Sequence, residues 1–471
     1  MAEKQIAPSG RRGTEAQGTR WREGEAGHDV PPGGETGETS GSPTVSAKLR
    51  RVAQQAARDP STIFTTLMHL IDEEFLREAY RRTRKNGAPG VDGVTADQYA
   101  VGLDANLRDL RERMRSGRYC APPVERVWIP KEDGRQRPIG KPTFEDKVAQ
   151  RAVTMLLEAV YEGDFRDCSY GFRPRRSAHQ ALHRLKEQCG KVKVGWIVDA
   201  DVSGFFDNLD HGLLREIVQR RVNDGGVIRL IGKWLNAGVL EEGVHRHSER
   251  GTPQGGVISP MLSNIFLHHV LDEWFYRELK PALAGEAFLI RFADDFIVGC
   301  ALEQDACRVM AALKERFESF RLSIHPEKTK LVRFGKPSAQ SGDGGGNGTF
   351  DLLGLTHYWS RSRGGFWVIK RKTAKKRQRR AMKSLWQWCR LNRHAPLAQQ
   401  HAVLSAKLRG HYQYYGVRFN FPMLERMSYH AKRAWRFWLR RRCHKDTTTW
   451  ERFKRLLEVF PLPRPRIIHA I

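Results

Sequence analysis

Residues 288–299 read Phe288-Leu289-Ile290-Arg291-Phe292-Ala293-Asp294-Asp295-Phe296-Ile297-Val298-Gly299, which puts two adjacent carboxylates between two apolar runs typical of β-strands. The turn of such a hairpin contains neither glycine nor asparagine, the residues that tight hairpin turns favour. Two like charges beside apolar walls are costly unless a cation neutralises them. The segment therefore predicts two paired strands joined at a cation-binding turn, although an Asp-Asp pair taken alone also fits ordinary turn chemistry.

A second apolar run ends in acid in the same way and reads Trp196-Ile197-Val198-Asp199-Ala200-Asp201. Strand alternation puts Asp199 and Asp201 on one face. If this strand neighbours the hairpin, Asp201, Asp294 and Asp295 converge on one spot. An all-oxygen site of this kind suits Mg²⁺, and two such ions would activate an attacking 3′-hydroxyl and stabilise a leaving pyrophosphate.

Charge is spread unevenly along the 471 residues, which carry a net charge of +28. Residues 1–50 hold 7 basic and 7 acidic side chains, residues 51–360 hold 45 and 42, and residues 361–471 hold 29 and 4. The excess of positive charge therefore lies almost wholly in the last segment. This pattern favours a near-neutral globular body with a dedicated nucleic-acid-binding module.

The cysteines and the hydropathy pattern indicate the cellular setting. The seven cysteines are scattered and form no C-x-x-C pair, which favours reduced thiols over a zinc site. The sequence has no run of about 18 apolar residues and no apolar signal core near its N-terminus. We expect a soluble, cytoplasmic and nucleoid-associated protein.

Four segments are expected along the chain. Residues 1–50 contain nine glycines and few large apolar side chains, which predicts a disordered tail. Residues 51–335 open with an amphipathic helix over residues 63–76 and then mix helical patterns with short apolar strands, so the fold class is α+β. Residues 336–370 predict a Gly/Ser-rich loop and a hairpin, and residues 371–471 a basic all-α module.

Several further sequence blocks follow one another in a recognisable order. They are Lys85-Asn86-Gly87-Ala88-Pro89-Gly90-Val91-Asp92-Gly93, Trp128-Ile129-Pro130-Lys131, Arg137-Pro138-Ile139-Gly140, Ser169-Tyr170-Gly171-Phe172-Arg173-Pro174, Asp201 to Asp207, Gly251-Thr252-Pro253-Gln254-Gly255-Gly256, Ser263-Asn264 and Phe292-Ala293-Asp294-Asp295. With these blocks, residues 62–440 resemble bacterial group II intron reverse transcriptases, also called maturases. Two positions depart from that family: Phe292 replaces the commoner tyrosine, and Lys141 replaces a usual aliphatic residue.

The resemblance implies a right-hand polymerase, with fingers and palm in residues 51–335, followed by an all-α thumb/maturase (X) domain. It implies an RNA-directed DNA polymerase that uses two Mg²⁺ ions, dNTPs, an RNA template and a DNA primer or target. It also implies binding of intron RNA to assist splicing and target-primed mobility. The HNH endonuclease of many relatives is expected to be absent, because its C-x-x-C pairs are missing.

Two other functions remain open at this point. One is a domesticated relative that acts in DNA repair or phage defence. The other is a non-enzymatic RNA-binding splicing factor, which would have no use for three metal-binding carboxylates.

The resemblance also implies roles for residues near the acidic turn. Asp201, Asp294 and Asp295 match the catalytic, metal-binding aspartates. Phe206 matches an aromatic gate that excludes a ribose 2′-hydroxyl, although a core phenylalanine is the plain alternative. Lys328 matches a lysine that protonates pyrophosphate, although a surface lysine fits equally well.

Three residues match the family's nucleotide pocket. Lys131 and Arg137 match residues that hold the incoming triphosphate, because cationic donors suit phosphate oxygens. Both could instead be solvated charges of a hairpin. Gln254 matches the glutamine that lines the pocket, and its alternative is an ordinary turn.

The basic module contains Gly410-His411-Tyr412-Gln413-Tyr414-Tyr415-Gly416, which resembles the motif of the family's domain X. Cations interleaved with aromatic rings suit unpaired RNA, since the cations meet phosphates and the rings stack on bases. We therefore expect RNA contacts from Arg377, Arg379, Arg380, Tyr412 and Tyr415. The aromatic residues could instead form that domain's core.

Overall fold

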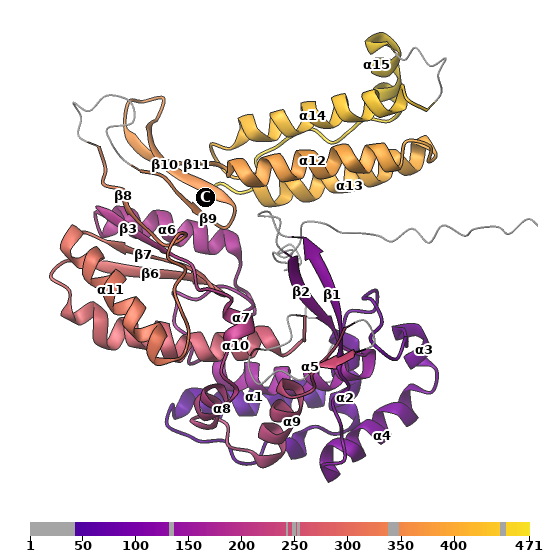
Figure 1. Cartoon of the computed structure of the whole chain (residues 1–471), viewed down its shortest axis with the longest axis vertical. Helices are drawn as coiled ribbons and strands as arrows, with labels where there is room; N and C mark the ends of the chain where they lie inside the picture. The colour runs from indigo at the N-terminus through magenta and orange to yellow at the C-terminus, as the bar shows by residue number, and fades with distance from the viewer. Residues whose placement is uncertain are drawn as a thin grey trace, which may run out of the picture.

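The computed structural model describes residues 43–130, 136–241, 244–246, 251, 255–337, 348–442 and 449–471. Figure 1 shows a helical lobe from the N-terminal part of the chain, a sheet with helices packed on it, and a bundle of long C-terminal helices. The strands of the described residues form three sheets. The fold is thus a mixture of helices and sheets, as the sequence predicts.

Helix α5 (Phe144–Tyr161) is the centre of the helical lobe. It is apolar on most of its surface, and residues such as Val148, Val153 and Leu156 are fully buried. A helix of this kind must be covered on all sides. The elements packed around this region are α1 (Pro43–Arg58), η1 (Met68–Leu70), α2 (Glu73–Arg82), α3 (Ala96–Ala100) and α4 (Leu103–Ser116).

A four-stranded sheet of order β2-β1-β4-β5 lies beside this lobe. Its strands are β1 (Val124–Pro130), β2 (Gln136–Lys141), β4 (Val239–Glu241) and β5 (Val244–Arg246). β1 pairs antiparallel with β2 and parallel with β4. β1 is thus one of the short apolar strands expected within residues 51–335.

The central sheet has the order β6-β7-β3-β8 and is antiparallel throughout. Its strands are β3 (Trp196–Ala200), β6 (Ala287–Phe292), β7 (Asp295–Cys300) and β8 (Lys330–Arg333). Both acidic runs predicted from the sequence are therefore strands of one sheet. β3 lies directly beside β7, which confirms the predicted neighbourhood.

Both faces of the central sheet are covered, which explains why β6 and β7 are apolar at nearly every position. One face, with Leu289 and Val298, belongs to the main core and packs on α11 (Glu303–Ser319). The other face, with Ile290 and Ile297, packs on α6 (Ala178–Lys191). The remaining elements of this half are α7 (Phe205–Asn208), α8 (His211–Gln219), α9 (Gly225–Leu235), α10 (Ser259–Leu267), η2 (His268–Glu273), η3 (Phe275–Leu279) and η4 (Lys280–Ala282).

A three-stranded sheet connects the central sheet to the C-terminal bundle (Figure 1). It consists of β9 (Phe350–Leu352), β10 (Leu355–Arg361) and β11 (Trp367–Thr373). The bundle follows as α12 (Lys375–Leu391), α13 (Leu397–Tyr415), α14 (Phe421–Leu439) and α15 (Trp450–Val459). Its core surrounds the fully buried Trp435.

Two sequence predictions about the N-terminal region need correction. The disordered tail was expected to reach residue 50, but α1 begins at Pro43 and buries Val45 completely. Residues 1–42 lie outside the described part. The helix expected over residues 63–76 begins only at Glu73, because the Asp72 carboxylate accepts a hydrogen bond from Phe75 N and caps the helix there.

Hydropathy gives one further result. Within the described part of the chain, no helix combines the length and the apolar character that crossing a bilayer requires.

Candidate active site

The acidic turn is as tight as a hairpin can be. Phe292 pairs with Asp295 across β6 and β7, so Ala293 and Asp294 alone make the connection. Ala293 has a φ of 56°, in the left-handed region that residues other than glycine rarely occupy. Such local strain tends to be kept at functional sites.

The register of the central sheet brings the second acidic run to the same edge. Ala200 of β3 pairs with Phe296 of β7 in an antiparallel ladder. Asp201 directly follows Ala200, and Asp295 directly precedes Phe296. The end of β3 and the start of β7 therefore lie at one edge, and each carries a carboxylate there.

A lysine already contacts this acidic edge. The Nζ atom of Lys328 lies 2.7 Å from Oδ2 of Asp201, and both side chains are about half exposed. The backbone supports the arrangement, because the amide of His325 donates to the carbonyl oxygen of Asp201 at 2.7 Å. Lys328 therefore lies at the acidic edge, while its role in protonating pyrophosphate stays a prediction.

The aspartates also repel one another. Desolvation, followed by the like charges of Asp294 and Asp199, raises the pKa of Asp295 to about 7. Asp295 itself is exposed at the surface, and the neighbouring carboxylates disfavour its ionised form. Burial, followed by Asp351 and Asp201, raises the pKa of Asp199 to about 7. An edge with this much negative charge favours a bound cation.

The donor atoms suit Mg²⁺, which prefers carboxylate oxygens. The side chains are nevertheless not gathered around one point: within the described ranges, no three His, Cys, Asp or Glu side chains lie close enough to hold a metal ion. Asp201 is instead engaged by Lys328. The edge therefore fits a divalent ion in its chemistry, and the carboxylate rotamers would have to change to ligate one.

Comparisons with known proteins include the strands that carry this site. The family described as "Reverse transcriptase (RNA-dependent DNA polymerase)" matches residues 129–357, which include both acidic strands and Lys328. Protein YkfC of Escherichia coli (strain K12) is 35% identical over 328 residues, which cover 61% of this chain and 84% of YkfC. The group II intron-encoded protein LtrA of Lactococcus lactis subsp. cremoris is 36% identical over 243 residues, which cover 51% of this chain and 40% of LtrA.

This chain belongs to the group II intron reverse transcriptase family. Nuclear intron maturase 1 of Arabidopsis thaliana is a more distant relative, 30% identical over 110 residues that cover 23% of this chain and 15% of the maturase. The matched part of the chain thus spans most of YkfC but less than half of LtrA.

The predicted sugar gate of this reverse transcriptase lies next to the acidic edge in sequence. Phe206 belongs to the short helix α7, is half buried and packs against the main core. Its ring meets that of Phe205 edge-on, with centroids 5.3 Å apart. The ring is thus partly core and partly accessible.

The predicted nucleotide residues are only partly described. Lys131 and Gln254 lie outside the described residues, and the same holds for the side chain of Arg137. The ends of the glycine-rich loop are described. A Cβ atom on Gly251 would lie 2.8 Å from the carbonyl oxygen of Asp207, and one on Gly255 would lie 2.3 Å from that of Gly140. The loop therefore runs against both α7 and β2 with no room for side chains at these points.

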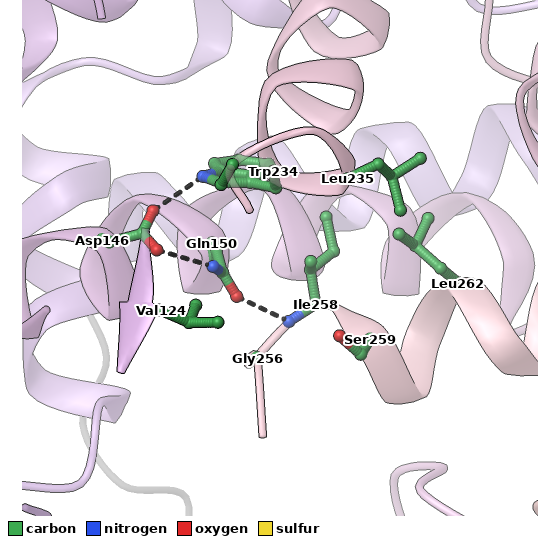
Figure 2. A pocket seen from close by; sticks show the side chains of 10 residues that line it. Val124, Asp146, Gln150, Trp234, Leu235, Gly256, Ile258, Ser259 and Leu262 are labelled. Carbon is green, nitrogen blue, oxygen red and sulfur yellow. Dashed lines mark hydrogen bonds between the residues drawn. The ribbon is translucent and has the colours of Figure 1, made fainter. Parts of the chain in front are cut away.

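A buried polar network holds the chain directly after this loop, at Ile258 (Figure 2). Asp146 of α5 is 2% exposed and accepts hydrogen bonds from Trp234 Nε1 at 2.7 Å, from Gln150 Nε2 at 2.9 Å and from the Tyr119 hydroxyl. Oε1 of Gln150 accepts from the backbone amide of Ile258 at 3.2 Å. Burial raises the pKa of Asp146 to about 6, against the opposing effect of its hydrogen bonds.

The predicted RNA contacts of the C-terminal bundle divide into two groups. Arg377 and Arg379 are exposed on α12, and Arg380 is half buried. The prediction for Tyr412 is wrong for the structure described here, because its side chain is only 2% exposed within the bundle core. Tyr415 is half buried and packs edge-on against Tyr414 at 4.8 Å, so it is part of a junction rather than an open face.

The sequence did not point to the turn that faces the acidic edge. Leu353 and Gly354 join β9 to β10 with φ angles of 52° and 76°, which is the two-residue hairpin turn that glycine favours. The hydroxyl of Tyr414 donates to the carbonyl oxygen of Leu353 at 2.9 Å, and a backbone hydrogen bond from Leu353 opposes the rise in the pKa of Asp295. The positive φ angles could not be read from Leu-Gly alone.

Proposed function

We propose that this reverse transcriptase copies RNA into DNA at the edge where β3 meets the β6–β7 hairpin. The pairing of Ala200 with Phe296 carries the proposal, because it delivers Asp201 and Asp295 to one edge from strands almost a hundred residues apart. The mutual repulsion of these carboxylates supports a cation-binding role. A splicing factor that only binds RNA would not need such a charge cluster.

Asp201, Asp294 and Asp295 would hold two Mg²⁺ ions, which would activate the primer 3′-hydroxyl and offset the charge of the triphosphate. The chain's own residues then have separate tasks. Lys328 is close enough to this edge to serve as a proton donor to the leaving pyrophosphate. Phe206 would limit the space available to a ribose 2′-hydroxyl.

Three residues are assigned to the incoming nucleotide by family resemblance. Lys131 and Arg137 would bind its phosphates, and Gln254 would line its pocket. The tight course of the loop at Gly251 and Gly255 supports the last assignment, because bulkier residues would push the loop away from β2 and α7.

The C-terminal bundle is proposed to be the thumb and maturase (X) domain of a right hand whose fingers and palm precede it. Its charge supports binding of the RNA template and of intron RNA, because residues 361–471 hold 29 basic and only 4 acidic side chains. Assistance to splicing and target-primed mobility would follow from that binding. No HNH endonuclease activity is proposed for this chain.

The test uses the full chain with a DNA primer annealed to an RNA template. We expect extension that depends on Mg²⁺ and dNTPs, and loss of at least about 99% of it in Asp294→Asn, since a lost metal ligand should raise the barrier by several kcal/mol. RNA affinity should stay within about twofold. A wild-type chain that binds the primer–template but does not extend it would refute the proposal.

A further inference from the structure

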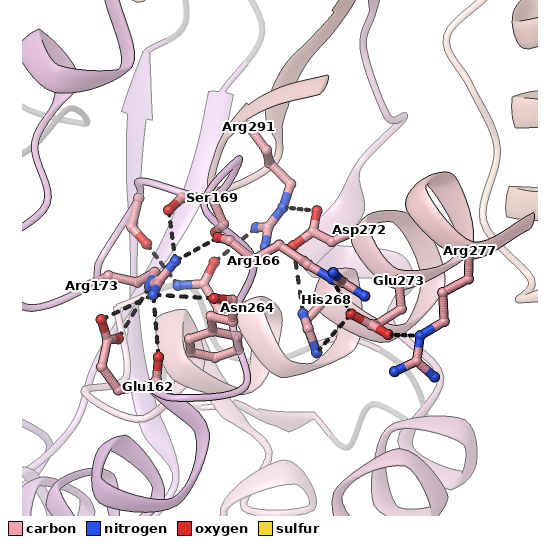
Figure 3. Close-up of polar contacts among 12 residues, drawn as sticks. Glu162, Arg166, Ser169, Arg173, Asn264, His268, Asp272, Glu273, Arg277 and Arg291 are labelled. Carbon is pink, nitrogen blue, oxygen red and sulfur yellow. Dashed lines mark hydrogen bonds and ion pairs between the residues drawn. The ribbon is translucent and has the colours of Figure 1, made fainter. Parts of the chain in front are cut away.

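Arg291 is a charged residue in the middle of an apolar strand. It lies in β6 and its side chain is completely buried. Its partner is Asp272, which is also completely buried: Nε donates to Oδ1 at 2.8 Å and Nη2 donates to Oδ2 at 2.5 Å (Figure 3). The two side chains thus form a bidentate ion pair that is shielded from water.

The remaining nitrogen of Arg291 reaches the acidic turn itself. Nη1 donates to the carbonyl oxygen of Ala293 at 3.1 Å and to Oδ1 of Asn264 at 2.9 Å. Ala293 is the strained residue directly before Asp294. The guanidinium therefore holds the turn from inside the protein, and its charge also interacts with that of Asp294.

Asn264 extends the contact to a third segment. Its Nδ2 donates to the carbonyl oxygen of Gly171 at 2.7 Å. Gly171 lies directly against the turn, because a Cβ atom there would be 2.3 Å from the amide nitrogen of Ala293. The neighbouring Tyr170 amide donates to the carbonyl oxygen of Arg291 at 2.9 Å, so this segment lines β6 on the outside.

The helix that carries Asp272 has an unusual form. Asn264 lies in the regular helix α10, whereas Asp272 lies in η2, a wide-turned π-helix that continues it. Wide turns of this kind occur mostly as local insertions in α-helices, and frequently at functional sites. Here the wide turn carries the Asp272 carboxylate, which accepts two hydrogen bonds from Arg291.

A buried ion pair is weak evidence for stability. Desolvation of two charges costs about as much as their attraction returns, and apolar residues of similar volume often stabilise a fold equally well. The pair does provide fixed geometry, since a planar guanidinium that donates hydrogen bonds to three residues leaves the turn little freedom. Displacements of about 1 Å in a catalytic group can reduce rates about 100-fold.

We propose that Arg291 is a positioning residue which, held by Asp272 and Asn264, sets the Ala293–Asp294 turn for metal binding. This inference rests on the proposed polymerase function. It assigns no contact with substrate to Arg291, which acts through the backbone of the turn.

The test removes the charges in pairs so that no buried charge is left alone. The variant is Arg291→Met with Asp272→Leu in the full chain. A matched control is Arg221→Met with Asp164→Leu in the helical lobe. Arg221 also forms a bidentate ion pair, in which Nε and Nη2 donate to the Asp164 carboxylate at 2.8 and 3.1 Å. Unfolding temperature and primer–template affinity are measured for both.

We expect the Arg291 variant to fold and to bind primer–template within about twofold of wild type. Its rate of nucleotide addition should fall about 10- to 100-fold, and its affinity for Mn²⁺, measured by electron paramagnetic resonance without nucleotide, should fall about tenfold. The control variant should keep both properties. Wild-type rate and Mn²⁺ affinity in a folded Arg291 variant would overturn the inference.

Two further outcomes are also decisive. If the Arg291 variant fails to fold, Asn264→Ala is the deciding variant, because it removes the hydrogen bond between Arg291 and Asn264 and leaves the ion pair intact. A normal rate and a normal Mn²⁺ affinity of this variant would refute positioning. A loss of both would support it. If the wild-type chain itself does not extend primers, the proposed function fails, while the Mn²⁺ comparison still tests Arg291.

Discussion

The ammonium group of Lys328 lies 2.7 Å from a carboxylate oxygen of Asp201, at the edge where β3 meets the acidic hairpin. The same contact admits two opposite roles. As a proton donor, Lys328 would speed release of pyrophosphate. As a counter-ion, it would compete with a metal ion for Asp201.

Lys328→Met separates these roles. Loss of a proton donor should lower the rate of nucleotide addition about 100-fold, because general acids typically contribute factors of about 10² to 10⁴. Loss of the counter-ion should lower the Mg²⁺ concentration for half-maximal activity, by no more than about fivefold, since exposed ion pairs contribute at most about 1 kcal/mol. Single-turnover extension across a Mg²⁺ series measures both.

Lys330→Met is the control for that variant, because Lys330 is exposed two residues further on and lies opposite Asp199, on whose carboxylate its charge acts. It should keep the rate of nucleotide addition. An unchanged rate in Lys328→Met would leave Lys328 as a counter-ion only.

Sugar selection gives a second prediction. Phe206→Ala should lower the ratio of dNTP to NTP incorporation efficiency by at least about tenfold, which corresponds to about 1.4 kcal/mol of lost discrimination. The reason is that the open part of the ring would no longer fill the volume of a 2′-hydroxyl. Phe206→Tyr, which keeps the ring, should preserve the ratio. If Phe206→Ala changes stability but leaves the ratio alone, the ring is a core residue.

The buried network around Asp146 predicts that the free energy of unfolding depends on pH. The pKa of Asp146 is about 6 in the folded chain against an ordinary value of 3.8. Between these values the folded chain binds more protons than the unfolded chain, so stability falls as pH rises and levels off above about 6. The shift corresponds to about 3 kcal/mol.

Asp146→Asn should abolish this contribution. The free energy of unfolding of wild type relative to the variant should therefore fall by about 2 kcal/mol between pH 4 and pH 7 in urea titrations, since part of the full shift is already lost at pH 4. Asp97→Asn, a change at an exposed carboxylate on α3, should run parallel to wild type. Parallel curves for Asp146→Asn would mean that this carboxylate titrates normally.

The strands of the acidic site were predictable because their environment leaves a simple signal. Both faces of the central sheet are buried, so β6 and β7 are apolar at almost every position, and the carboxylates at their ends stand out. Arg291 breaks the same apolar run and was visible in the sequence. Its partner Asp272 lies nineteen residues earlier, and nothing local indicates that the two meet.

The errors have equally specific causes. Tyr412 lies in a motif rich in cations and aromatic rings, and such composition does not say which ring faces the core. Residues 43–50 were assigned to the tail because glycine-rich sequence precedes them, yet Val45, Leu49 and Val52 follow helical spacing and pack inward. In both cases packing against distant residues decided the outcome.

The last prediction concerns the basic C-terminal bundle. Arg377 and Arg379 are exposed on α12, so reversing both charges with glutamate should disturb the core little. If both contact RNA phosphates, the slope of log K against log salt should become shallower by about 1.4 to 1.8, at about 0.7 to 0.9 per contact. Arg380 is half buried and is left unchanged, because its reversal would mix folding with binding effects. Filter binding or fluorescence anisotropy across a salt series measures the slope.

The matched control reverses Arg308 and Lys314, which are exposed on α11 and lie on the face of the central sheet opposite α6. It changes the net charge by the same amount, so a purely long-range effect of net charge would weaken binding equally in both variants. Direct phosphate contacts instead predict a shallower slope only for the α12 variant, since counterion release reports contacts and not total charge. Equal slopes in wild type and both variants would mean that Arg377 and Arg379 do not contact RNA phosphates and that the RNA binds elsewhere on the chain.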